Sequence, residues 1–223
     1  MKNLVYVAIG TALTLASCNK QTSSSTEIEA KDNQTFADLD QARIKHLSLD
    51  IETDFDTHQI KGSAAYTFEN NQAKQIILDT EKLTIDSVLL ANGQKTTYKL
   101  GEKDSIKGQA LIIDVTTNDT IVKVFYKTSP DANALQWLNP QQTHDKKHPF
   151  LLSQGQAILT RSWIPIQDTP SVRLTYDAKV KTPKDLLPLM SAINPKEKNA
   201  EGVYTFKMPQ PIAPYLIALA VGD

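Results

Sequence analysis

Two glutamines on either side of a glycine form the most distinctive polar pattern of the sequence. The pattern covers residues 154–157 and reads Gln154-Gly155-Gln156-Ala157. Side chains two positions apart on an extended chain point the same way, so both amides would line one cleft. Glutamines are usually surface residues, and the spacing alone does not separate a binding loop from ordinary surface.

A second pattern with potential chemistry is the histidine pair in the stretch HDKKH. His144 and His148 are four positions apart, the spacing at which two helical side chains ligate one metal ion. Pro149 follows directly, no apolar helical face surrounds the pair, and Asp145 stands where a general-base glutamate would be. We therefore expect a solvated loop at this position and no metal site.

Other catalytic and metal-binding motifs are missing from the sequence. Asp54 and Asp56 lack the further oxygen ligands and the glycine of a calcium loop. There is no glycine-rich phosphate loop, no serine nucleophile elbow and no His-Glu-x-x-His zinc motif. We expect no catalytic residue, no metal ligand and no cofactor in this chain.

Charge and cysteine content exclude two further classes of protein. Lys and Arg number 24 against 25 Asp and Glu, which gives a net charge of -1. A nucleic-acid binder needs a basic face that displaces counterions from phosphates, so nucleic acid is not an expected partner. The single cysteine excludes a disulfide scaffold and a cysteine-rich zinc ribbon, because each needs at least two thiols.

The first residues have the features of an export signal. Lys2 provides a positive charge, and the apolar run at 4–15 is too short to span the ~30 Å of bilayer hydrocarbon. Residues 15–18 read Leu-Ala-Ser-Cys and resemble the lipobox of bacterial lipoproteins, in which the cysteine becomes the lipidated first residue. We expect a signal peptide at 1–17, lipid attachment at Cys18, and a membrane-anchored, exported protein in the bacterial cell envelope. The alternative is a soluble secreted protein with a chance cysteine at the cleavage site.

The remainder divides into a tether and one folded domain. Ser, Thr, Asn, Gln and charged residues dominate the segment 18–38, which cannot bury enough apolar surface to fold. From there, alternation such as that of Leu47, Leu49 and Ile51 with polar residues predicts strands with one solvated face. Further strand-like runs occupy residues 60–68, 75–79, 83–90, 96–100, 111–115, 121–127, 157–163, 172–180 and 203–208. Many short strands without a sustained helical period predict an all-β sheet or sandwich at 39–223.

Three shorter segments carry local signals. Residues 92–93 (Asn-Gly) lie between two strand-like runs and tolerate the positive φ of a type I′ hairpin turn. Residues 182–185 (Thr-Pro-Lys-Asp) predict one short helical turn, which Pro188 ends. Residues 215–221 (YLIALAV) predict a strand buried on both faces, and we expect residues beyond Asp223 to cover it.

Several motifs occur in an order that resembles the amino-terminal domain of peptidase family M1, which includes leukotriene A4 hydrolase and related bacterial aminopeptidases. They are LDT at 78–80, LTI at 83–85, ALQWL at 134–138, HPFLLSQGQA at 148–157, QDTPSV at 167–172, LMSAI at 189–193 and YLIAL at 215–219. The resemblance covers most of the predicted folded domain. It implies a large saddle-like all-β sandwich with mixed sheets and few short helical turns, packed against a zinc-containing catalytic domain that lies beyond residue 223.

The resemblance also implies a role for the glutamine pattern. In the family, a zinc-bound water activated by a glutamate attacks the first peptide carbonyl of the substrate. Gln156 matches the second glutamine of the family's Gln-x-Gln-Ala motif, which contacts the α-ammonium of the substrate, and Gln154 and Ala157 complete this substrate-binding motif. Many relatives have glutamate at the position of Gln156, and relatives often have cysteine at the positions of Gly155 and Ile166.

Two functions are expected on this basis. The first is the substrate-anchoring domain of a zinc aminopeptidase that binds peptides by their free amino terminus, with zinc in the full-length enzyme and no activity in this chain alone. The alternative is a stand-alone lipoprotein module that binds peptides or a partner protein without catalysis. A reading frame that continues into a His-Glu-x-x-His motif would distinguish the two.

Overall fold

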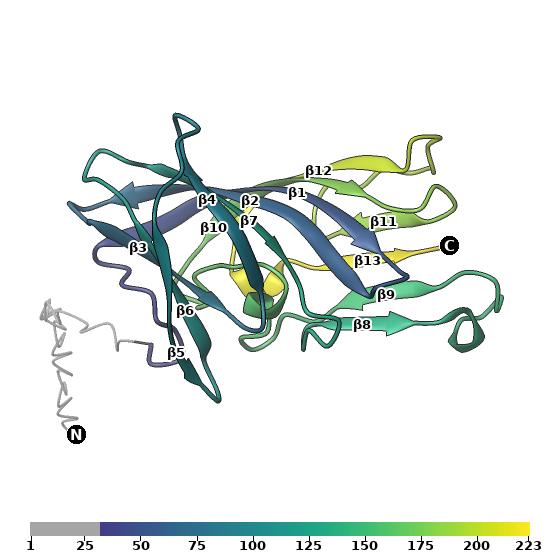
Figure 1. The fold of residues 1–223 in the computed structure, drawn as a ribbon. Helices are drawn as coiled ribbons and strands as arrows, with labels where there is room; N and C mark the ends of the chain where they lie inside the picture. The colour runs from purple at the N-terminus through teal and green to yellow at the C-terminus, as the bar shows by residue number, and fades with distance from the viewer. Residues whose placement is uncertain (1–31) are drawn as a thin grey trace, which may run out of the picture. The chain divides into compact units, whose positions relative to one another are not determined.

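The computed structural model describes residues 32–223, and the predictions for Cys18 and the signal peptide lie outside this range (Figure 1). The described part contains three short 3-10 helices, η1 (Pro140–Gln142), η2 (Thr160–Ser162) and η3 (Pro214–Leu216). No helix within residues 32–223 has the length and apolar character needed to cross a membrane. The strands are β1 (Ala42–Asp54), β2 (Gln59–Asn70), β3 (Gln75–Thr80), β4 (Thr84–Leu90), β5 (Tyr98–Asp104), β6 (Gly108–Asp114), β7 (Ile121–Lys127), β8 (Leu135–Leu138), β9 (Phe150–Ser153), β10 (Leu174–Lys181), β11 (Leu187–Met190), β12 (Val203–Ile212) and β13 (Leu219–Gly222).

The largest sheet has six strands in the order β12-β10-β1-β2-β7-β4. It is mixed, because β1 runs parallel to β10 and all other neighbouring strands are antiparallel. Leu47, Leu49 and Ile51 of β1 are at most 2% exposed, whereas Asp50 between them faces solvent. The alternation predicted for this strand is confirmed.

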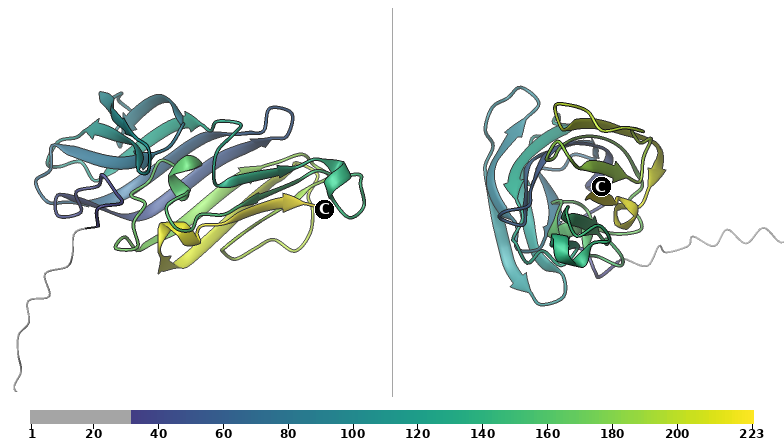
Figure 2. Two further views of the ribbon diagram at one scale, coloured as in Figure 1. Left: turned by 90° about the horizontal axis from the view of Figure 1, so that it is seen from below. Right: turned by 90° about the vertical axis from the view of Figure 1, so that its right-hand side faces the viewer.

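Two smaller sheets pack with the large one around a common core. Their strand orders are β3-β6-β5 and β11-β13-β9-β8. Figures 1 and 2 show the three-stranded sheet at the end of the domain opposite to the four-stranded sheet, which is drawn in green and yellow. Apolar side chains from all three sheets join one buried cluster, to which Tyr66, Ile113 and Val221 belong. The predicted all-β sandwich with mixed sheets is confirmed.

The segment 157–163 is not a strand, in contrast to its prediction. It forms turns followed by η2, and Arg161 and Trp163 within it are at most 1% exposed. η2 is fully buried although its residues, Thr160, Arg161 and Ser162, are polar, and such residues occur both in strands and in helical turns. Composition therefore could not separate the two.

The apolar run 215–221 is also only partly a strand. Its first residues belong to η3, and the strand β13 begins at Leu219. β13 lies between β11 and β9, and Leu219 and Val221 are at most 1% exposed. Leu216 and Ala218 are exposed, so the prediction of a strand buried on both faces is wrong. The coverage of this run by residues beyond Asp223 stays a prediction.

Two predicted turns have different geometries. The turn at 92–93 is not type I′, since only its glycine has a positive φ, 79°, and the strands on either side belong to different sheets. Residues 182–185 form no helical turn. A β-turn closes there through a hydrogen bond from the Leu186 N–H to the Pro183 carbonyl (3.0 Å).

Residues 35–37, which the sequence predicts to be part of the tether, contact the folded core. The Thr35 hydroxyl donates to Oδ2 of Asp79 (2.6 Å), and the Phe36 N–H donates to its Oδ1 (2.7 Å). Ala37 is only 6% exposed. The ordered unit therefore includes the residues just before position 39, and a buried carboxylate holds them.

Candidate functional site

The glutamine loop, residues 154–157, begins where β9 ends. The Gln154 N–H donates to the Ala134 carbonyl (2.8 Å), which fixes the start of the loop to the residue before β8. Gly155 is buried, and the peptide bond between residues 156 and 157 is cis. The three loop residues exposed to solvent are Gln154, Gln156 and Ala157.

The two glutamine side chains differ in what they contact. Oε1 of Gln154 accepts a hydrogen bond from the backbone N–H of Gln156 (2.9 Å). Within residues 32–223 the side-chain amide of Gln156 makes no hydrogen bond. Gln154 therefore stabilises the loop backbone, and the side chain of Gln156 remains exposed to solvent. That both amides line one cleft stays a prediction, and the structure shows that Oε1 of Gln154 is already engaged by the loop backbone.

Gly155 occupies a space with no room for a side chain. A Cβ atom at this position would lie 2.7 Å from Oγ1 of Thr160 and 2.7 Å from the carbonyl oxygen of Tyr215. The Gly155 carbonyl accepts from the Leu159 N–H (2.8 Å), which closes the turn that leads into η2. The loop is thus packed between η2 and η3, and the position of Gln156 follows from the positions of these two helical turns.

A buried ion cluster, Arg161 with Asp79 and Asp168, supports the loop at η2. Nε of Arg161 lies 3.3 Å from Oδ2 of Asp168, and its Nη2 lies 3.7 Å from Oδ2 of Asp79. The guanidinium also donates to three backbone carbonyls, those of Lys107 (2.7 Å), Gln34 (2.9 Å) and Asp168 (3.0 Å). One side chain therefore connects η2 to β3, to the β5–β6 turn and to the segment before β1.

Burial dominates the ionisation of the two carboxyl groups in this cluster. Loss of hydration raises the pKa of Asp168 to about 6 and also raises the pKa of Asp79, while the Arg161 charge opposes both shifts. The pairing could not be predicted from the sequence, because Asp79 and Arg161 are far apart in the chain. All three side chains are at most 1% exposed, so the cluster holds η2 and the glutamine loop in place.

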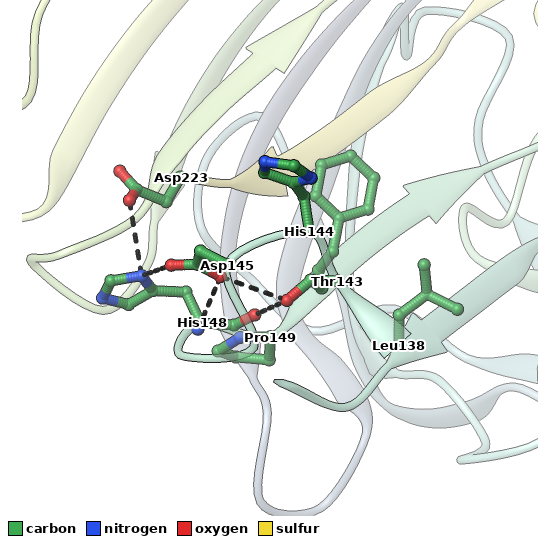
Figure 3. Close-up of a pocket in the computed structure, with 8 residues that line it drawn as sticks. Leu138, Thr143, His144, Asp145, His148, Pro149 and Asp223 are labelled. Carbon is green, nitrogen blue, oxygen red and sulfur yellow. Dashed lines mark hydrogen bonds and ion pairs between the residues drawn. The ribbon is translucent and has the colours of Figure 1, made fainter. Parts of the chain in front are cut away.

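The histidine pair lies in a loop, as expected, and its two members are separated (Figure 3). The loop lines an open cavity of about 460 Å³ together with Leu138 and Phe150. His144 is exposed, whereas Nδ1 of His148 faces carboxylate oxygens of Asp145 (2.9 Å) and Asp223 (3.3 Å). His148 is therefore paired with a carboxylate of its own loop and with one from a distant segment, and not with His144.

Comparison with known proteins identifies the family and the fold. The profile of the family described as Peptidase M1 N-terminal domain matches residues 43–216. The chain belongs to this family. Leukotriene A-4 hydrolase of Xenopus laevis is 42% identical over 203 residues, and the match covers 86% of this M1 domain and 33% of the relative. Leucine aminopeptidase 2 of Yarrowia lipolytica is 36% identical over 197 residues, and this match covers 86% of the chain and 30% of the relative. The M1 domain spans about a third of the length of these relatives.

Solved structures share the architecture of the M1 domain. Native yeast LTA4 hydrolase has a TM-score of 0.81 and 28% identity, with a match over 89% of this chain and 31% of that chain. The M1 zinc metallopeptidase of Deinococcus radiodurans has a TM-score of 0.64 and 17% identity over 82% of this chain and 42% of that chain, a likeness in fold alone. The resemblance inferred from motif order is confirmed.

Proposed function

We propose that this M1 domain anchors the substrate in a zinc aminopeptidase that removes amino-terminal residues from peptides. The observation that carries the proposal is the exposed, unpaired amide of Gln156 on a loop fixed by η2 and η3 within an M1 domain. The names of the relatives, leukotriene A-4 hydrolase and leucine aminopeptidase 2, support a hydrolase that recognises amino-terminal residues.

The chemistry of an amide suits recognition of a free amino terminus. An ammonium group that leaves water needs hydrogen-bond acceptors, and the Oε1 atom of Gln156 provides one without adding a charge. The hydrogen bond from the Gln156 N–H to Gln154 fixes the backbone from which this side chain projects. An amine held at a fixed position relative to the reacting bond limits cleavage to the first residue.

The catalytic metal would be held outside this chain. The sequence has no His-Glu-x-x-His motif, so its residues do not fit the catalytic zinc site of a metallopeptidase. In the complete enzyme, zinc would supply a polarised carbonyl and an activated water, and Gln156 would supply the position of the substrate. The domain that carries the zinc is the expected partner of this chain.

Exposed apolar residues of β11, of η3 and at position 193 support a docking face for that partner. Leu189 of β11, Ile193 and Leu216 of η3 are 43%, 66% and 45% exposed. Because the Tyr215 backbone packs directly against the position of Gly155, a domain that covers η3 would place its active site next to Gln156.

The full-length protein should hydrolyse leucine p-nitroanilide, and it should lose about ten- to a hundredfold in kcat/KM when the substrate amine is acetylated. Acetylation removes the ammonium that Gln156 contacts. Treatment with a zinc chelator should abolish turnover, and the 223-residue chain alone should be inactive. Peptide binding without any hydrolysis by the full-length protein would instead support the stand-alone binding module.

We also propose export and lipid anchoring at Cys18 in the bacterial cell envelope. The support is the Leu-Ala-Ser-Cys sequence at the end of a short apolar run, which the positively charged Lys2 precedes. A bacterial lipoprotein carries two or three acyl chains, which hold a membrane firmly, whereas one chain binds only marginally. Labelled palmitate should therefore be incorporated into the wild type and not into Cys18→Ser, and membrane pellets washed with salt should retain only the wild type. Equal labelling of the variant would exclude Cys18 as the anchor.

A further inference from the structure

Three ligand atoms of the kind that metals prefer converge at the rim of the cavity shown in Figure 3. They are Nδ1 of His148, Oδ2 of Asp145 and Oδ2 of Asp223, and all lie within 4.8 Å of one another. Asp145 and His148 come from the loop after η1, and Asp223 follows β13. Residues far apart in the sequence thus meet with their polar atoms directed to one point.

Nδ1 of His148 can satisfy only one of the two carboxylate oxygens that it faces. An imidazole Nδ1 carries at most one hydrogen, yet it faces Asp145 Oδ2 at 2.9 Å and Asp223 Oδ2 at 3.3 Å. The other oxygen of each carboxylate is already engaged: Oδ1 of Asp145 accepts from the Lys147 N–H (3.0 Å), and Oδ1 of Asp223 pairs with Lys198. Each carboxylate is therefore held by Oδ1, and the two Oδ2 atoms compete for the single hydrogen that Nδ1 of His148 can carry.

The charges in the group also call for a cation. Asp185 adds a third carboxylate, with its Oδ2 3.6 Å from Nε2 of His148. Lys198 is the one ammonium group that pairs with these carboxylates among the described residues. Three negative charges against one positive charge leave a surplus of two when the imidazole is neutral, which is the charge of one divalent ion.

We propose that His148, Asp145 and Asp223 bind a divalent transition-metal ion, with Zn²⁺ as the probe that fits best. Zinc bonds of about 2.0–2.1 Å in a tetrahedron separate neighbouring ligand atoms by roughly 3.3 Å, close to the spacing of Nδ1 from both oxygens. An imidazole ligand favours zinc, copper or nickel over calcium and magnesium, which prefer oxygen ligands throughout.

The ion would fix the loop after η1 to the end of β13. The open cavity beside the three ligands leaves room for water as a fourth ligand. This site involves His148 without His144, so it differs from the helical pair that the four-residue spacing suggested. It replaces the expectation that the chain has no metal ligand, and it does not depend on the proposed peptidase function.

The test is zinc binding by the metal-stripped 223-residue chain in a Cys18→Ser background, since a thiolate also binds zinc. Isothermal titration calorimetry should show one zinc per chain, and zinc should raise the melting temperature. His148→Gln and Asp223→Asn should each weaken zinc binding by at least about tenfold. Removing a residue that only hydrogen-bonds to a metal ligand already lowers metal affinity by about this factor. His144→Gln is the matched control, because it changes a histidine that lines the same cavity outside the ligand group, and it should bind as the parent does.

Three results would overturn the proposal. The first is the absence of saturable zinc binding by a parent chain whose circular dichroism shows folded β structure. The second is an equal loss of affinity in His144→Gln and His148→Gln, and the third is equal affinity for Mg²⁺ and Zn²⁺; either would indicate nonspecific binding by an acidic loop. The d–d absorption spectrum of the Co²⁺-substituted chain gives a second readout, because its intensity reports tetrahedral ligation and should disappear in Asp223→Asn.

Discussion

Arg161→Met should lower the free energy of unfolding by about 3–5 kcal/mol, the usual cost of removing one partner from a buried ion pair. The variant leaves two buried carboxylates, Asp79 and Asp168, without their cation. It also leaves three backbone carbonyls without the guanidinium donors. Methionine fills much of the same volume, so the loss reports charge and hydrogen bonding more than a cavity. Urea denaturation of the 223-residue chain, followed by tryptophan fluorescence, measures it.

The pH dependence of this loss has a defined sign. Without Arg161, the pKa values of Asp79 and Asp168 rise further above their values in the unfolded chain, since the opposing charge is gone. A raised pKa in the folded state favours folding at low pH, and this contribution is lost as pH increases through the raised value. The deficit of Arg161→Met relative to the wild type should therefore be larger at pH 8 than at pH 5.

Arg173→Met is the matched control for this prediction. Arg173 is exposed and has no ion pair among the described residues, so its replacement should change stability by no more than about 0.5 kcal/mol. Adding Asp79→Asn and Asp168→Asn to Arg161→Met should restore part of the loss, because no buried charge then remains. Equal stability of Arg161→Met and Arg173→Met would show that the buried cluster does not stabilise the domain.

The alternation of apolar and polar residues predicted those strands that have one face exposed to solvent. The buried residues Leu47, Leu49 and Ile51 alternate with polar ones along β1, and this pattern alone locates the strand. Every side chain from residue 160 to residue 163 is buried, so the alternation of buried and exposed positions that marks a strand is missing there. The fold was therefore predictable from the amphipathic strands and not from the fully buried connections.

The candidate site was only partly predictable for a different reason. The resemblance to family M1 identified Gln156, but the sequence could not show that the neighbouring Gln154 amide is bound to the backbone. The supporting contacts are tertiary: Tyr215 closes the space around Gly155, and Arg161 pairs with a carboxylate of β3. Local spacing contains no information about such contacts between distant segments.

Gln156→Leu in the full-length enzyme should reduce kcat/KM for substrates with a free amino terminus on the order of ten- to a hundredfold. A hydrogen bond to a charged group contributes about 1.5–3 kcal/mol, and each ~1.4 kcal/mol corresponds to a factor of ten. Leucine keeps the approximate size of glutamine and removes the acceptor. The zinc content should not change, because the contact that we propose for Gln156 is with the substrate and not with the metal. Steady-state kinetics with leucine p-nitroanilide, alongside metal analysis, measure both quantities.

Gln141→Leu is the matched control, since Gln141 is another exposed glutamine, and its side chain makes no hydrogen bond within residues 32–223. It should have wild-type kinetics. Gln156→Glu should lose less than Gln156→Leu, because a carboxylate keeps an acceptor next to the ammonium, although tighter binding of the ground state need not increase kcat. The loss in Gln156→Leu should also be confined to free-amine substrates, so N-acetylated substrates should respond equally to variant and wild type. If Gln156→Leu matches Gln141→Leu on leucine p-nitroanilide, Gln156 does not contact the substrate amine, and the loop is ordinary surface of the β-domain.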